Sequence, residues 1–234
     1  MSRDPRAALR ASLAEQLSAL RGVPAAELPP ALLDVAVQRI DLPGGEAFLV
    51  RPADWEQLRH EEGGAGRPAP YWATAWPSGL VLAAALTDAP PEPGTRVLEL
   101  GCGLGLPSLV CARAGARVLA TDGSTDAVAF AAHSLALNEL DAEVAHVDWA
   151  RQGDALARRG SWDLVLAADV LYTRANVEVA LRLLPRLLAP GGEAVVADPR
   201  RAGGRDFLAA ARATFAVRTR QQGDVALHRL TRRR

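Results

Sequence analysis

The chain lacks lysine altogether: its 27 basic residues are all arginines, and they balance 27 acidic residues to a formal charge of zero. A neutral charge balance gives no electrostatic basis for bulk binding to nucleic acid, so we expect no nucleic-acid partner. No uncharged apolar run approaches the length of a membrane span, so we expect no membrane partner either. Nearly half of the residues are apolar, which is enough for a full hydrophobic core.

Cysteine is scarce as well, and no residues have the spacing of a metal site. The two cysteines, Cys102 and Cys111, are too few for a disulfide scaffold. The first residues do not have the pattern of a signal peptide, so we expect a cytoplasmic protein, and we expect a monomer without a metal. Four histidines are scattered along the chain and are expected at the surface: His60, His133, His146 and His228.

Strand-like and helix-like runs alternate from residue 95 onward. Such repeats predict a parallel sheet with right-handed crossover connections. Two final runs, 215–219 and 225–230, are separated by a Gly-Asp turn and predict a closing antiparallel hairpin. The expected parallel strands are 96–100, 117–121, 143–147, 164–168 and 193–197. The expected helices are 106–114, 125–138 and 205–213. A further helix is expected to follow residue 172 and to end near residue 188, before Pro190–Gly192.

We expect residues 1–69 to form an N-terminal extension to a main domain that covers 70–234. Asp4 and Pro5 have the pattern of a helix start, and leucines at helical spacing follow them. Two strand-like runs around a Pro-Gly-Gly turn predict a hairpin, and a Gly- and Pro-rich stretch predicts a loop. These segments are 35–42 with 46–51 for the hairpin, and 61–70 for the loop.

A glycine-rich loop at 101–105 directly follows the apolar strand of residues 97–100. A helix begins just after the loop, with Pro107 in its first turn, where the missing N–H costs nothing. Glycines let the backbone approach a ligand, and a helix N-terminus presents N–H groups to it. Dinucleotides and S-adenosylmethionine are both bound by this layout. The dinucleotide pattern G-x-G-x-x-G needs a glycine where this chain has Leu106, which disfavours an NAD oxidoreductase.

Polar or aromatic residues follow all five expected parallel strands. Ligands of open α/β sheets bind outside the carboxyl ends of the strands, so these residues are expected in one crevice. Asp122 there can accept hydrogen bonds from both ribose hydroxyls. Asp148 can accept one from an adenine amino group while Trp149 stacks on the ring, although a simple strand-end turn explains this pair equally well. The five groups are 99–105, Asp122, 148–149, 169–172 and 198–200.

A short segment before the main domain, residues 70–79, contains Tyr71, Trp72 and Trp76 in a chain with only 5% aromatic residues. It has two interpretations. The three rings can form a packing plug against the main domain. Alternatively, they form a lid over a ligand, because aromatic faces attract a cation such as a sulfonium.

Together these motifs resemble those of the class I S-adenosylmethionine-dependent methyltransferases, from about Trp72 to the C-terminus. The loop matches their first motif, E/D-x-G-x-G-x-G. The run 169–172 is similar to the D-x-x-Y motif of the seven-β-strand protein lysine methyltransferases. Within that group, the segments 70–79 and 198–202 resemble the methyltransferase of the electron-transfer flavoprotein β-subunit and its bacterial relatives.

The resemblance implies a Rossmann-like, seven-stranded, mostly parallel sheet with helices on both faces, and S-adenosylmethionine as the cofactor. It implies methyl transfer to a protein lysine, with Asp169 and Tyr172 as the catalytic residues of the acceptor site. The partner would be a protein that carries the target lysine, such as an electron-transfer flavoprotein β-subunit-like or ribosomal protein. The implied cofactor-binding residues are Trp76, Glu99, Gly101, Cys102, Gly103, Gly105, Asp122, Asp148, Trp149 and Asp169.

Other interpretations stay open at this point. A small-molecule methyltransferase, similar to nicotinamide N-methyltransferase, would have a closed apolar acceptor pocket, sealed by the segment 71–76. A protein methyltransferase would have an open, shallow one. A non-catalytic binding protein of the same fold is disfavoured by the intact glycines, Asp122 and Asp169. Asp169 itself has a plain alternative role as the N-cap of the helix that follows it.

Overall fold

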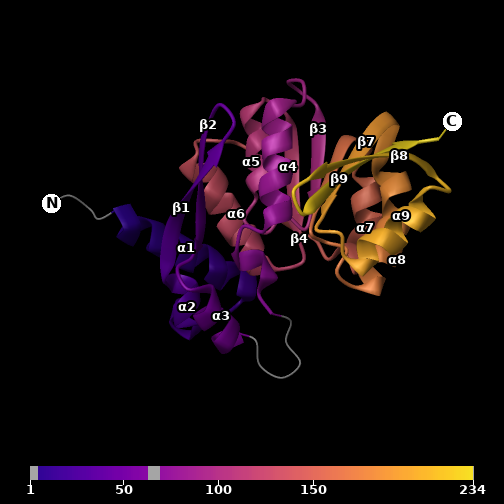
Figure 1. Cartoon of the computed structure of the whole chain (residues 1–234). Coiled ribbons are helices and arrows are strands. Elements are labelled where there is room, and N and C mark those ends of the chain that lie inside the picture. The colour runs from indigo at the N-terminus through magenta and orange to yellow at the C-terminus, as the bar shows by residue number, and fades with distance from the viewer. Residues whose placement is uncertain (1–4, 63–68, 234) are drawn as a thin grey trace.

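The computed structural model describes residues 5–62 and 69–233. Its main sheet has seven strands: β3 (Arg96–Leu100), β4 (Arg117–Asp122), β5 (Glu143–His146), β6 (Trp162–Ala168), β7 (Leu188–Asp198), β8 (Phe215–Gln222) and β9 (Val225–Arg232). Their order is β5-β4-β3-β6-β7-β9-β8 (Figure 1). β3 to β7 pair in parallel, whereas β9 runs antiparallel to β7 and β8. The expected mostly parallel sheet with a closing hairpin is confirmed.

Helices cover both faces of this sheet, as expected. They are α4 (Pro77–Asp88), α5 (Leu106–Arg113), α6 (Thr125–Leu137), α7 (Trp149–Arg158), α8 (Arg174–Leu187) and α9 (Ala202–Ala211). Successive residues of β3 point to opposite faces. Val97 packs in one core with α4, α5 and α6, whereas Leu98 packs in a second core with α7, α8 and α9.

The N-terminal residues form a hairpin together with one long helix and several short ones. The elements are α1 (Pro5–Arg21), η1 (Ala25–Glu27), α2 (Pro30–Leu33), β1 (Val35–Leu42), β2 (Gly45–Pro52), α3 (Trp55–Glu62) and η2 (Tyr71–Ala73). The predicted hairpin is confirmed by the antiparallel pairing of β1 with β2. Asp4 and residues 63–68 of the predicted loop lie outside the described residues. The first two residues of that loop, 61–62, belong to α3 instead.

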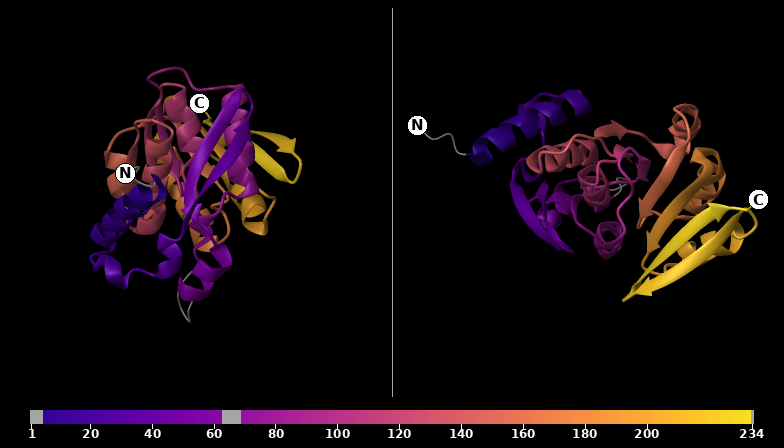
Figure 2. Two further views of the ribbon diagram at one scale, coloured as in Figure 1. Left: turned by 90° about the vertical axis from the view of Figure 1, so that its left-hand side faces the viewer. Right: turned by 90° about the horizontal axis from the view of Figure 1, so that it is seen from above.

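The hairpin docks on α6 through backbone groups of β2. Asn138, just after α6, accepts from Phe48 N at 3.1 Å and donates to Phe48 O at 2.7 Å. Ser134 Oγ accepts from Val50 N at 3.0 Å. An edge strand leaves such groups unpaired, so these side chains replace a neighbouring strand. The N-terminal elements lie beside α6 in both views of Figure 2, and Leu13 of α1 belongs to the same core as Phe130 of α6.

A charged contact joins the end of α1 to the start of α6. Arg21 Nε and Nη2 donate to the two oxygens of Asp126, at 2.7 and 2.5 Å, and Nη2 also lies 3.1 Å from Glu62 Oε1. The hydrogen bond with Asp126 raises the pKa of the Arg21 guanidinium, against the opposing effect of burial. A planar guanidinium matches a carboxylate at two points, which fixes both distance and orientation. α1 is therefore held in one register on α6.

Glu99 joins β3 to α5 inside the core. Its side chain is 1% exposed, and its Oε2 accepts from Ser108 N at 3.0 Å and from Ser108 Oγ at 2.5 Å. Burial raises the pKa of this carboxyl to about 8, because the charged form loses its hydration. The two bonds from Ser108 oppose that shift.

The structure corrects three expectations. α7 was not predicted, because its sequence is polar on average and only Gly153 and Leu156 are buried. Pro190–Gly192 was predicted to end a helix, but α8 ends at Leu187 and these residues lie within β7. His228 was predicted at the surface, but it is buried on β9 beside Thr219 Oγ1, and burial lowers its pKa. Several predicted helix ends are also shifted by a few residues.

We expect Asn138→Ala to lower the free energy of unfolding by about 1–3 kcal/mol, because it leaves backbone groups of β2 without partners. The control is Arg39→Ala on β1, whose ion pairs with Asp41 and Glu46 are exposed. That change is expected to leave the free energy of unfolding nearly unchanged, because solvent screens exposed ion pairs. Urea unfolding of both variants measures the difference. Equal losses would show that Asn138 does not hold the hairpin.

A second prediction concerns pH. The pKa of Glu99 is about 8 in the folded chain and near 4.5 in an unfolded one, so ionisation is harder in the folded state. The wild type therefore loses stability as the pH rises between these two values. Glu99→Gln cannot ionise and is expected to lack this part of the pH dependence. Melting temperatures of both proteins measured across that range test the assignment; parallel curves would contradict it.

Candidate functional site

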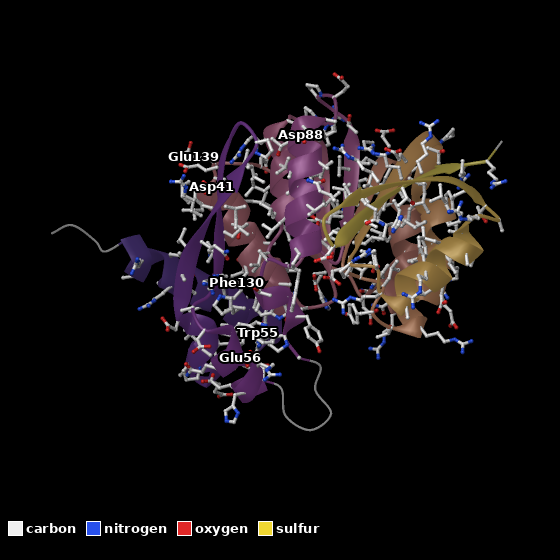
Figure 3. The ribbon with its side chains drawn as sticks, viewed as in Figure 1. Asp41, Trp55, Glu56, Asp88, Phe130 and Glu139 are labelled. Carbon is white, nitrogen blue, oxygen red and sulfur yellow. The ribbon has the colours of Figure 1, made fainter. Side chains whose placement is uncertain are left out.

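The strand order brings the carboxyl ends of four strands together at one edge of the sheet. β3 lies between β4 and β6, and β7 follows β6. After β3 the chain adds β4 and β5 on one side of the sheet, and it then returns to add β6 and β7 on the other side. Such a topological switch point leaves a crevice outside the strand ends. Trp55 lies toward this end of the molecule in Figure 3, whereas Asp88 and Glu139 lie toward the opposite end.

The glycine loop turns sharply through left-handed backbone at the predicted positions. The φ angles of Gly101, Gly103 and Gly105 are +68°, +53° and +81°. A Cβ on Gly101 would lie 2.9 Å from Val170 Cγ1, one on Gly103 3.3 Å from Trp72 O, and one on Gly105 3.2 Å from an Ala131 atom. The missing side chains therefore make room for other segments of the chain as well as for a ligand.

Asp122 lies beside this loop at the end of β4. Its Oδ2 accepts from Gly103 N and its Oδ1 from Ser124 N, both at 2.9 Å. Burial raises the pKa of this carboxyl, and the two backbone bonds act against the rise. Each oxygen keeps a lone pair that a hydroxyl donor can use.

Two other candidates near the loop are engaged with neighbouring parts of the chain. Glu99 uses its carboxylate to hold Ser108 of α5. Cys102 donates its backbone N–H to Thr121 O at 2.9 Å, and its thiol is buried. Burial raises the pKa of that thiol well above its usual value, so it is not a thiolate nucleophile. Their contact with a cofactor stays a prediction.

Asp148 and Trp149 have a structural role at the end of β5. Asp148 is the N-cap of α7, and its Oδ1 accepts from Ala150 N at 3.0 Å and Arg151 N at 3.3 Å. Trp149 is half-buried against the core under α7 and α8. The strand-end turn considered from the sequence is present, and stacking of Trp149 on adenine stays a prediction.

Asp169 occupies a strained position at the end of β6. Its φ is +59°, a left-handed value that costs a non-glycine residue roughly 1–3 kcal/mol and persists where the surroundings enforce it. Its N–H donates to Ala197 O of β7 at 2.9 Å. The N-cap of α8 is Thr173, which accepts from Asn176 N at 3.1 Å. Asp169 is therefore not the cap of α8, and its carboxylate is not used at the start of that helix.

Sequence reasoning missed the partner of Asp169. Arg201 Nη2 lies 2.6 Å from Asp169 Oδ1; the contact is an ion pair rather than an aligned hydrogen bond, since this oxygen accepts none from the described residues. Asp198, at the end of β7, accepts from Arg201 N at 2.8 Å. Burial and the charge of Asp169 raise the pKa of Asp198. The Asp-Pro-Arg-Arg run after the strand was the only signal in the sequence.

Four aromatic rings form a row that begins at Tyr172, just after the end of β6. Ring centroids are 6.1 Å apart for Tyr172 and Tyr71, 6.2 Å for Tyr71 and Trp76, and 6.4 Å for Trp76 and Trp55. Trp76 Nε1 donates to Tyr71 O at 2.6 Å, which fixes the turn between them. Tyr172 and Tyr71 are 54% and 51% exposed. Trp55, from α3, had not been identified from the sequence.

The packing interpretation of the segment 70–79 holds for Trp72, whereas the lid over a ligand stays a prediction. Trp72 is the plug: its ring lies 5.0 Å from Phe130 of α6, and its carbonyl faces Gly103. Tyr71 and Trp76 lie on the outer side with Tyr172. The segment covers part of the glycine loop and leaves the ring of Tyr71 half exposed.

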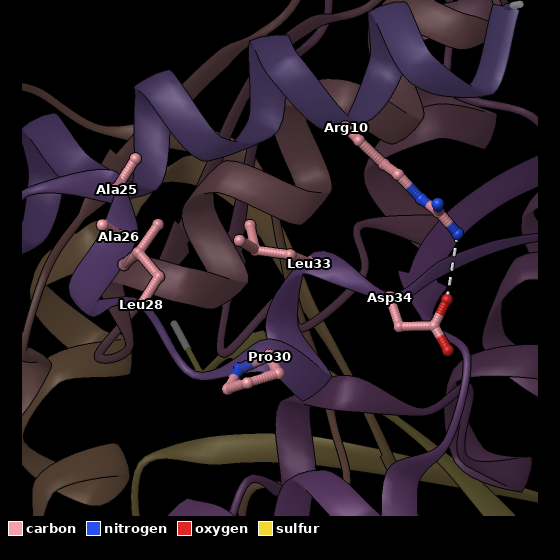
Figure 4. A pocket seen from close by; sticks show the side chains of 7 residues that line it. All are labelled: Arg10, Ala25, Ala26, Leu28, Pro30, Leu33 and Asp34. Carbon is pink, nitrogen blue, oxygen red and sulfur yellow. Dashed lines mark hydrogen bonds and ion pairs between the residues drawn. The ribbon is translucent and has the colours of Figure 1, made fainter.

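A separate shallow hollow of about 420 Å³ lies in the N-terminal extension, away from the strand ends (Figure 4). It is mostly apolar, with one ion pair of 3.0 Å between Arg10 and Asp34. None of the candidate site residues lines it. The lining residues are Arg10, Ala25, Ala26, Leu28, Pro30, Leu33 and Asp34.

Residues 5–62 and 69–233 contain neither a metal-binding cluster nor a membrane-spanning helix. No cluster of His, Cys, Asp and Glu side chains in these ranges is arranged to hold a metal ion. None of the helices in the described part combines the length and apolar character needed to cross a bilayer.

Comparison of the sequence with known proteins identifies its relatives. The family described as lysine methyltransferase matches residues 60–213. The electron transfer flavoprotein beta subunit lysine methyltransferase of Danio rerio is 31% identical over 58% of this chain and 52% of its own length. A ubiquinone biosynthesis O-methyltransferase of Rhizobium rhizogenes is 36% identical over 56% and 50%. The protein N-lysine methyltransferase METTL21A of Danio rerio is 31% identical over 62% and 69%. The chain thus spans about half the length of the first two relatives.

Solved structures share the fold. The Thermus thermophilus 16S rRNA N2 G1207 methyltransferase, in complex with AdoMet and guanosine, has a TM-score of 0.63 and 22% identity over 85% of this chain and 51% of that chain. The ribosomal protein L11 methylase of Lactobacillus delbrueckii has a TM-score of 0.57 and 21% identity over 69% and 81%. Fold, glycine loop and sequence agree: the chain belongs to the lysine methyltransferase family of class I methyltransferases, whose methyl donor is S-adenosylmethionine.

Proposed function

We propose that the chain transfers a methyl group from S-adenosylmethionine to the amine of a lysine side chain on a protein substrate. The observation that carries this proposal is the carboxylate of Asp169 at the end of β6, with Tyr172 three residues further along the chain. A carboxylate suits a cationic acceptor, and the half-exposed rings of Tyr172 and Tyr71 leave that end of the site open. An open mouth admits a side chain that remains attached to a folded protein.

The residues present fit the cofactor. Asp122 keeps lone pairs for two hydroxyls of a ribose, and the glycine loop beside it has no side chains in the way. Aromatic faces of Trp76 and Tyr71 can lie against a positive sulfonium. When bound, S-adenosylmethionine supplies a methyl group that is already strongly electrophilic.

The acceptor end has to orient the amine and remove its charge. Asp169 holds the lysine ammonium by a charge-assisted hydrogen bond, in a place fixed by strained backbone and by the bond to Ala197. Tyr172 borders the same position and limits the directions from which the side chain enters. Alignment of the nucleophile with the methyl group supplies most of the rate gain. In this proposal the proton leaves to water, because no contact among the described residues places a second base against the acceptor.

The named relatives support the lysine acceptor. Two of them are called lysine methyltransferases, one acting on the electron transfer flavoprotein beta subunit. The proposed partner is accordingly a protein with a target lysine, of the electron-transfer flavoprotein β-subunit-like or ribosomal kind. The monomeric state, the cytoplasmic location and the boundary between the N-terminal extension and the main domain near residue 69 stay predictions.

Small-molecule O-methylation is the second candidate. It is favoured by relatives named ubiquinone biosynthesis O-methyltransferase, at 36% and 32% identity. It requires an enclosed apolar acceptor site. The exposure of Tyr71 and Tyr172 argues against such closure, although the segment 71–76 does cover part of the glycine loop.

We expect Asp169→Ala and Asp122→Ala to separate catalysis from cofactor binding. Asp169→Ala removes one charge-assisted contact with the acceptor and is expected to lower turnover roughly 10- to 100-fold while cofactor affinity is kept. Asp122→Ala is expected to weaken cofactor binding and to regain much activity at saturating cofactor. Calorimetry with S-adenosylhomocysteine and saturated turnover are measured side by side. Normal turnover of Asp169→Ala would exclude Asp169 from the acceptor site.

Methyl-labelled cofactor and lysate from a strain without this protein identify the class of acceptor. We expect label on a protein band, and methyl-lysine after acid hydrolysis of that band. The enzyme has no lysine, so label on its own band cannot be methyl-lysine and serves as an internal control. Label that passes entirely into an organic extract would instead favour small-molecule O-methylation.

A further inference from the structure

Arg201 pairs with the carboxylate that the proposed function assigns to the acceptor. The Arg201 and Asp169 side chains are 45% and 10% exposed, and the ion pair measures 2.6 Å. The carboxylate is thus nearly buried and fixed, whereas the guanidinium reaches it from the solvent side. A cation of this chain therefore lies where a cationic acceptor has to bind.

The backbone of Arg201 is held while its side chain can leave. Asp198 is 1% exposed and accepts from Arg201 N at 2.8 Å, at the N-cap of α9. Gly204 lies so close to Asp198 that a Cβ there would overlap its carboxylate, so the two segments are tightly packed. Removal of the Arg201 guanidinium from Asp169 breaks none of these contacts.

The neighbouring arginines are engaged elsewhere. Arg200 Nη2 lies 3.3 Å from Asp224 in the β8–β9 turn. Arg205 Nη1 donates to the carbonyl of Arg200 at 3.3 Å. In the described residues, Arg201 is the cation paired with Asp169.

We propose that Arg201 occupies Asp169 until the ammonium of a cationic acceptor displaces it, so that Arg201 competes with the acceptor for this carboxylate. This inference rests on the function proposed above, because Asp169 has to be the acceptor carboxylate. An ammonium carries the charge that replaces the guanidinium, and its N–H groups donate to the same oxygen. A neutral hydroxyl cannot neutralise Asp169, so it leaves Arg201 in place.

The first test is the concentration of acceptor needed for half-maximal rate, with the labelled lysate protein diluted in series. We expect Arg201→Ala and Arg201→Gln to lower this concentration roughly three- to tenfold, a modest change because the pair is partly solvated. The saturated rate is expected to stay the same. The matched control is Arg205→Ala, which removes one positive charge from the same end of α9 and is expected to change neither value.

The second test needs no turnover. Protein loaded with S-adenosylhomocysteine is titrated by calorimetry with n-butylammonium, which has the length and charge of a lysine side chain, and with n-butanol as its neutral counterpart. Arg201→Ala is expected to bind n-butylammonium three- to tenfold more tightly than wild type and n-butanol equally. In an Asp169→Asn background, the Arg201→Ala effect on n-butylammonium is expected to vanish.

The outcomes separate the two proposals. If Arg201→Ala changes neither the acceptor concentration needed for half-maximal rate nor the affinity for n-butylammonium, the proposed role of Arg201 is overturned, whatever the acceptor is. A fall in saturated rate at constant half-saturation also overturns it, because Arg201 would then hold Asp169 in position instead of competing for it. Absence of methyl-lysine in the wild-type reaction overturns the proposed function, and the calorimetric arm then still decides whether Arg201 blocks a cation.

Discussion

Three left-handed glycines let three other segments of the chain converge on one short loop, and the whole site depends on that convergence. Gly101 leaves room for Val170 after β6, Gly103 for the backbone of Trp72, and Gly105 for Ala131 of α6. The N–H of Gly103 also binds Asp122 at the end of β4. A side chain at any of these positions would meet protein atoms and require an unfavourable φ. The loop therefore sets the distances among cofactor-side and acceptor-side groups at once.

The negative charge at the ends of β6 and β7 is balanced by the chain itself. Asp169 and Asp198 end neighbouring parallel strands, which places two carboxylates close together and raises the pKa of Asp198. Arg201 offsets their charge from the surface, and its own backbone is anchored by Asp198. The arrangement pairs a nearly buried carboxylate with a cation that is itself about half exposed. Such a site can exchange one cation for another at low cost, since the total charge does not change.

The N-terminal extension contributes to the same site. Asn138 and Ser134 form hydrogen bonds with the backbone of β2, and Arg21 of α1 pairs with Asp126 at the start of α6. α3 then follows the hairpin and places Trp55 against Trp76. The N-terminal elements therefore contribute Trp55 to the row of aromatic rings. The contacts that hold these elements on α6 are made by other residues.

The sequence by itself determined the alternating strands and helices, the hairpins, the glycine loop and the aspartates at strand ends, because each depends on local periodicity or turn residues. It did not predict α7, because the sequence of that helix is polar on average, and it did not predict the burial of His228. Only the tertiary structure paired Arg201 with Asp169 and Trp55 with Trp76. These contacts join segments that are distant in the chain, and their partners are chosen by sheet order and packing, which leave no local pattern in the sequence.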